Sequence, residues 1–164
     1  MSLGIVKIIK SSPLFLELLD EEIDDFIKGC EVERFEPNEH IIREGTDGDE
    51  IHLILTGKAW VRRGDLSIAE LGKGDILGEL ILLNQTSRTA DVIASTAVDA
   101  LVIEYDYIFR YFKKNPKLFA ILMLNLSRML AGRLKKAGSD LQAMAFKNKE
   151  LKNKLKEVTE NQDL

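Results

Sequence analysis

Cysteine, proline and long apolar runs are all scarce in this chain of 164 residues. Its single cysteine, Cys30, excludes an internal disulfide and is typical of proteins in a reducing compartment. No apolar run approaches the roughly 20 residues of a membrane-spanning helix, and the N-terminus lacks the pattern of a secretory signal. With a formal net charge of −4, the surface as a whole is not basic enough to bind nucleic acid. We expect a cytoplasmic protein that binds neither membranes nor nucleic acids.

What the chain does contain is 45% hydrophobic residues, enough for a core, at a length that suits one compact domain with an appendage. Apolar residues at helical spacing predict helix over residues 5–30, with an acidic turn near Asp20. Residues 31–105 instead alternate short β-rich runs with glycines, which is typical of a sandwich or jelly-roll barrel. The expected strands are Val32–Phe35, Ile41–Arg43, Ile51–Leu55, Ala59–Arg62, Ser67–Leu71, Ala90–Ser95 and Ala100–Tyr105, and the one helix expected among them follows Gly78.

From Asp106 onward the pattern is helical again, and Pro116 suits the first turn of a long helix. Apolar residues then recur at alternating steps of three and four, as in a coiled coil. These positions are Leu134, Ala137, Leu141, Met144, Asn148, Leu151, Leu155 and Val158. A buried Asn148 would fix the register of a parallel two-stranded coil, so the pattern predicts a homodimer. Alternatively, Gly138-Ser139-Asp140 ends one helix and caps another, which folds the tail back as a hairpin.

One short segment carries chemistry. Gly78 and Glu79 open an apolar turn, and Arg88 and Thr89 follow a polar loop. A glycine at the mouth of a helix lets the backbone N–H groups of Leu80, Ile81 and Leu82 approach an anion. Arg88 supplies charge-assisted bonds to phosphate and Thr89 two more donors, whereas the Glu79 carboxylate suits a ribose hydroxyl. A cyclic nucleotide presents these groups side by side. The alternative is that Glu79 and Arg88 form a surface ion pair beside an ordinary turn.

From Pro13 to Ala145 the chain resembles the cyclic nucleotide-binding domain family, which includes the bacterial cyclic AMP receptor protein, kinase regulatory subunits and gated channels. The family's phosphate-binding cassette runs Phe-Gly-Glu-x-Ala-Leu, a short loop, then Pro-Arg-x-Ala. Here it reads Leu77-Gly78-Glu79-Leu80-Ile81-Leu82 and then Ser87-Arg88-Thr89-Ala90. Residues 37–45, 51–57 and the Gly74-Asp75 turn also match the family. The resemblance implies a β-roll with flanking helices and a long C-terminal helix.

By the same resemblance, Glu79 binds the ribose 2′-hydroxyl and Arg88 the cyclic phosphate. The implied ligand-binding residues are Gly78, Glu79, Leu80, Ile81, Arg88, Thr89 and Ala90. The helix after the barrel acts as a lid over the base, with Arg133 and Ala137 as candidate contacts, and the helix hinge near Phe109–Phe119 moves to close it. We therefore expect a cyclic nucleotide-binding domain over residues 5–132 and a lid and dimerisation helix over residues 133–164.

The departures from the family pattern concern occupancy and base preference. Ile81 stands where the family has a small residue, and its branched side chain crowds the phosphate position. The two hydroxyl residues that meet the purine in the bacterial receptor correspond to Ala137 and Gly138, so the sequence leaves cyclic AMP and cyclic GMP both open. Two other functions also stay open: a dimerisation scaffold without ligand, and a truncated transcription regulator. No nucleophile–base pair or metal-ligand cluster emerges, so we expect a binding domain with no cofactor, no enzyme activity and an unknown downstream protein partner.

Overall fold

A computed structural model describes residues 2–79, 82 and 87–160 of the chain, and their side chains up to residue 155. The helical elements are α1 (Leu3–Lys10), the 3-10 turns η1 (Pro13–Phe15) and η2 (Ile27–Gly29), α2 (Asp20–Phe26), α3 (Tyr105–Lys114) and α4 (Pro116–Glu160). The strands are β1 (Glu31–Phe35), β2 (His40–Ile42), β3 (Glu50–Thr56), β4 (Lys58–Arg63), β5 (Leu66–Gly72), β6 (Ile76–Leu77), β7 (Asp91–Ala94) and β8 (Val98–Glu104).

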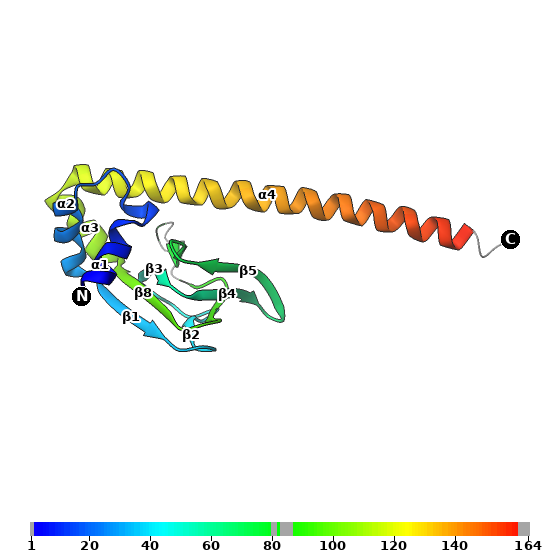
Figure 1. Ribbon diagram of the computed structural model, residues 1–164, viewed down its shortest axis with the longest axis horizontal. Coiled ribbons are helices and arrows are strands. Elements are labelled where there is room, and N and C mark those ends of the chain that lie inside the picture. The colour runs from blue at the N-terminus through cyan, green and yellow to red at the C-terminus, as the bar shows by residue number, and fades with distance from the viewer. Residues whose placement is uncertain (1, 80–81, 83–86, 161–164) are drawn as a thin grey trace. The chain divides into compact units, whose positions relative to one another are not determined.

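The strands form two four-stranded antiparallel sheets, in the orders β1-β8-β3-β6 and β2-β7-β4-β5 (Figure 1). Alternate residues of each strand point to opposite faces of its sheet, and the inner faces share one apolar core. That core comprises Phe35, Ile41, Ile42, Ile54, Ala59, Leu71, Leu77, Val92, Ala94, Val98 and Ala100. On its other face the first sheet contacts α1 through β3 and α3 through β8. The predicted β-roll with flanking helices is confirmed.

The helical structure predicted over residues 5–30 is present, divided into two α-helices and two 3-10 turns. The division begins at Ser12-Pro13, where the Ser12 hydroxyl accepts from the Leu14 amide at 3.3 Å and proline has no N–H to continue α1. All seven predicted strands are present, with boundaries shifted by one or two residues. The short β6 was missed because two residues between Gly74 and Gly78 carry no periodic signal. The helix expected after Gly78 falls largely outside the described residues.

The chain forms two compact units, Met1–Asn125 and Leu126–Leu164, and α4 supplies residues to both. In the first unit, Leu118 and Leu122 of α4 are buried, and the Asn125 amide donates to the carbonyls of Leu14 and Leu16 at 3.0 and 2.7 Å. In the second unit the helix continues without a break through Gly138. The alternative hairpin at Gly138 is therefore wrong, whereas the predicted domain boundary after residue 132 stays a prediction.

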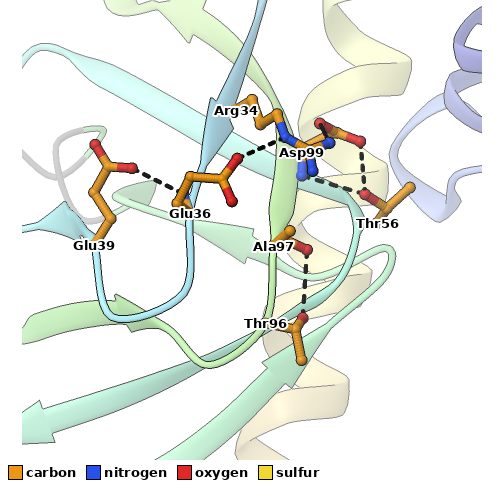
Figure 2. Close-up of polar contacts among 7 residues, drawn as sticks. All are labelled: Arg34, Glu36, Glu39, Thr56, Thr96, Ala97 and Asp99. Atoms are coloured by element: carbon orange, nitrogen blue, oxygen red, sulfur yellow. Dashed lines mark hydrogen bonds and ion pairs between the residues drawn. The ribbon is translucent and has the colours of Figure 1, made fainter.

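Hydrogen bonds and ion pairs between charged and hydroxyl side chains connect the strand ends at one end of the barrel (Figure 2). Arg34 of β1 lies 3.4 Å from the Asp99 carboxylate of β8, which in turn accepts from the Thr56 hydroxyl of β3 at 2.9 Å. The candidate site lies at the opposite end of β3, where the strand starts with Glu50. None of the helices in the described part of the chain is long and apolar enough to span a bilayer.

Candidate functional site

Main-chain hydrogen bonds position Arg88 just before β7 of the second sheet. Its amide donates to the Thr46 carbonyl at 2.8 Å, and its carbonyl accepts from the Gly45 amide at 2.8 Å. An isolated bridge between Asp47 and Ser87 extends this pairing by one position. The loop between β2 and β3 therefore fixes the backbone from which the Arg88 side chain extends.

The Arg88 guanidinium reaches from there to the first sheet, and the residue as a whole is only 9% exposed. Its Nη2 donates to the Glu50 carbonyl at 2.8 Å and to the Glu50 carboxylate at 3.0 Å, and its Nη1 donates to the Gly78 carbonyl at 3.3 Å. A guanidinium has five N–H groups. Among the described residues these three bonds leave the Nε–H and one Nη1–H of Arg88 available for an anion.

Two glycines make room for this guanidinium. A Cβ atom at Gly48 would overlap Nη2 of Arg88, and one at Gly78 would overlap Nη1 and lie 2.8 Å from the Glu50 carbonyl oxygen. Gly78 also has a φ of +76°, which side chains strongly disfavour. The pairing of β6 with β3, in which Leu77 faces His52, brings Gly78 beside Glu50.

The charge of Arg88 affects the titration of both neighbours. Burial opposes ionisation of Glu50, but hydrogen bonds from Asp49 and the charge of Arg88 outweigh it, so the pKa of Glu50 falls below its usual value. For His52, burial and then the charge of Arg88 lower the pKa to about 4. Near neutral pH the site thus holds a guanidinium, a carboxylate and a neutral imidazole.

Of the predicted ligand-binding residues, the structure gathers Gly78, Glu79 and Arg88 at one end of the barrel, where Glu79 is half-buried. Thr89 is exposed and Ala90 half-buried beside them. Leu80 and Ile81 lie outside the described residues. The reading of Arg88 as part of a surface ion pair is wrong, because its side chain is buried.

The sequence reasoning missed Gly48 and Glu50, although both stand in the acidic segment just before β3. The signal that could have found Glu50 is the cluster of carboxylates at the start of β3, because an arginine at a site is often paired with a carboxylate from another strand end. The base candidates Arg133 and Ala137 lie on the part of α4 that belongs to the second unit, and their role stays a prediction. The predicted dimerisation residues of that unit are exposed: Leu134, Leu141, Met144, Asn148, Leu151 and Leu155.

A buried arginine, two closely packed glycines and a carboxylate therefore lie together at one end of the β-roll. The family model of the cyclic nucleotide-binding domain matches residues 32–115. The chain belongs to this family. The match contains all of the barrel strands except Glu31, together with both glycines and Arg88, so the family assignment and the candidate site concern the same residues.

Relatives of this cyclic nucleotide-binding domain include a cyclic AMP receptor protein and a cGMP-dependent protein kinase. The cyclic AMP receptor protein of Thermus thermophilus is 28% identical over 142 residues, which are 84% of this chain and 64% of the receptor. A cGMP-dependent protein kinase of Drosophila melanogaster is 32% identical over 109 residues, 62% of this chain and 14% of the kinase. The chain thus spans less than two thirds of either relative's length.

Among solved structures, a cyclic nucleotide-binding domain from Methylobacillus flagellatus superposes with a TM-score of 0.71 at 26% identity, over 80% of this chain and 77% of that one.

Proposed function

We propose that this domain is a sensor of cyclic AMP or cyclic GMP, a regulatory binding module and not an enzyme. The observation that carries the proposal is the buried Arg88, whose guanidinium donates to two main-chain carbonyls and to the Glu50 carboxylate and keeps two N–H groups unused by described residues. A buried cation with unused donors is a strong site for phosphate, because the bonds are charge-assisted and little solvent screens them.

In this proposal the remaining N–H groups of Arg88 bind the cyclic phosphate, and the backbone N–H groups of Leu80 and Ile81 complete its shell with Thr89 and Ala90. Glu79, next to Gly78, accepts from the ribose 2′-hydroxyl. Glu79 and Arg88 thus bind different parts of the ligand. A carboxylate accepts from the ribose hydroxyl and repels phosphate, whereas a guanidinium binds the phosphate.

We further propose that ligand binding moves α3 and the start of α4, and that the exposed apolar stripe of the second unit forms a parallel homodimer. The break between the two helices at Asn115, with Pro116 opening α4, supplies the hinge, and Arg133 and Ala137 approach the base when it closes. Such a movement signals only if the nucleotide binds the two conformations with different affinity.

Isothermal titration calorimetry with cyclic AMP and with cyclic GMP tests the proposal on the wild type and on Arg88→Ala. We expect saturable heat with at least one nucleotide. The substitution should weaken binding by about 2–5 kcal/mol, because the phosphate loses its charged partner. Arg88→Lys serves as the matched control, since it keeps the charge and loses the fork of donors, and it should lie between the two.

Two other functions remain as outcomes of this experiment. Absence of heat with both nucleotides would favour a dimerisation scaffold whose cassette takes no ligand, with the bulk of Ile81 as the cause. Tight binding to duplex DNA that weakens steeply with salt would favour a transcription regulator. The downstream protein partner of the sensor is to be sought with the nucleotide-loaded domain.

A further inference from the structure

A cavity opens on the barrel side of the first sheet. It shares Glu50 and His52 with the surroundings of Arg88 and adds carboxylates that form no ion pair with that arginine. It has a volume of about 310 Å³ and is lined from β1, β2, β3 and β8 together with the segments before β1 and β3. Five of its lining residues are carboxylates: Glu31, Glu33, Asp49, Glu50 and Glu104. The apolar residues Phe35, Ile41 and Val102 complete much of the wall.

The strand register explains why the acidic residues gather. β8 lies between β1 and β3, and Val102 pairs with Glu31 on one side and with His52 on the other. Glu104 pairs directly with Glu50. Alternate residues share a face, so Glu31 and Glu33 point to the same side as Phe35 of the barrel core. Like charges on neighbouring strands repel, so this arrangement costs stability unless a cation compensates it.

Within the described part of the chain, few positive charges offset the repulsion among these carboxylates. The side chains of Glu31 and Glu33 make no ion pair or hydrogen bond with any described residue. Glu104 lies 3.9 Å from Arg110, but both side chains are about two-thirds exposed, so solvent screens that pair. Arg88 neutralises Glu50 alone.

His52 supplies an independent sign of a missing ligand. Its side chain lines the cavity and is 3% exposed, yet its Nδ1 is buried with no hydrogen-bond partner among the described residues. A buried polar atom without a partner costs about 1–3 kcal/mol, so such atoms are rare and require an explanation. The imidazole is neutral near pH 7 because its pKa is lowered to about 4 by burial and by Arg88, and a neutral ring keeps a lone pair for a donor.

We propose that this cavity binds a small aliphatic diamine or polyamine. Its ammonium groups donate to the carboxylates of Glu31, Glu33 and Glu104 and to the ring of His52, and its methylene chain packs on Phe35, Ile41 and Val102. A metal ion fits less well, since no three His, Cys, Asp or Glu residues of the described chain are grouped to hold one. Several separate carboxylates over an apolar wall match a chain with separate cations. The cavity borders the Arg88 site at Glu50 and His52, but Glu31, Glu33 and Glu104 form no ion pair with Arg88.

Nuclear magnetic resonance of the histidine rings tests the proposal, with spermidine as the probe. The chain has two histidines, so His52 is observed in the cavity and His40 serves as an internal control. We expect saturable shifts of the His52 ring signals at constant ionic strength, with those of His40 unchanged. The titration is made without nucleotide, so failure of the sensor proposal does not affect it.

The decisive variant is Glu31→Gln/Glu33→Gln, which removes two charges from exposed strand positions, so we expect it to fold like the wild type. It should weaken spermidine binding by roughly tenfold or more. The matched control is Glu21→Gln/Asp65→Asn, which removes the same charge from exposed positions outside the cavity and should bind like the wild type. Unmoved His52 signals, equal loss in both variants, or saturation by Mg²⁺ or Zn²⁺ in place of spermidine would each overturn the proposal.

Discussion

Arg88 and Glu50 meet at 3.0 Å between the two sheets, although 38 residues separate them in the sequence. The Arg88 side chain is 7% exposed and that of Glu50 31%, so the pair lies at the boundary between core and solvent. The same guanidinium also donates to the Glu50 carbonyl, which no side-chain substitution removes. Glu50 therefore acts in two ways: its backbone positions Arg88, and its carboxylate competes for it with any incoming anion.

Replacing Glu50 by Gln separates these two effects. We expect Glu50→Gln to tighten cyclic nucleotide binding by about tenfold, or about 1.4 kcal/mol, because the phosphate no longer competes with a carboxylate. The free protein should lose roughly 1–2 kcal/mol of stability, since a largely buried guanidinium loses its counterion. Calorimetry and urea unfolding measure the two effects. Weaker binding in this variant would mean that the carboxylate orients Arg88 and does not compete.

Gly48→Ala tests the space around the guanidinium. The added methyl overlaps Nη2 of Arg88, so the side chain must leave its carbonyl partners. We expect roughly tenfold or greater loss of nucleotide affinity and a loss of about 1–3 kcal/mol of stability. Gly4→Ala is the control, because nothing lies within 4 Å of its added Cβ. If both variants bind nucleotide equally well, the guanidinium has another favourable position.

His52 predicts a pH dependence of stability with a definite sign. Its pKa is about 4 in the folded protein, against the ordinary histidine value of 6.5 in the unfolded chain, so only the unfolded state takes up a proton between these values. Above pH 6.5, His52 therefore takes nothing from the free energy of unfolding. As the pH is lowered to 4, the free energy of unfolding falls by about 3 kcal/mol because of His52. Urea unfolding at a series of pH values should show this slope in the wild type.

His52→Gln should reduce the slope between pH 6.5 and 4, whereas His40→Gln should leave the part due to His52 in place. Comparing variants in this way cancels the titration of the many carboxylates in the same range. Identical slopes in the wild type and His52→Gln would show that His52 does not stay neutral in the fold.

The proposed dimer depends on exposed leucines of α4. Leu141 is 66% and Leu151 55% exposed in the single chain, a loss of apolar burial that pairing would recover. We expect Leu141→Glu/Leu151→Glu to be monomeric at concentrations where the wild type sediments as a dimer. Ser139→Glu/Asn153→Glu adds the same charge on the outer side of the predicted coil and should remain dimeric. A monomeric wild type would contradict the predicted coiled-coil dimer.

The sequence alone determined the parts of this protein that depend on local patterns. Glycine-separated β-rich runs gave the strands of the barrel, and Pro116 gave the start of α4. The spacing of Gly78, Glu79 and Arg88 indicated an anion site because the required residue types lie within one short segment. Local signals also misled: helical spacing continued across Ser12-Pro13, where the chain turns.

Only the tertiary structure decided what surrounds Arg88. Its partner Glu50 and the glycine that accommodates it, Gly48, come from the start of β3 and the loop before it, and nothing in their local sequence specifies that they meet an arginine. The same holds for the acidic cavity, since Glu31 and Glu104 become neighbours of His52 only through the register of β1, β8 and β3. Such contacts depend on long-range strand pairing, which a pattern of neighbouring residues cannot encode.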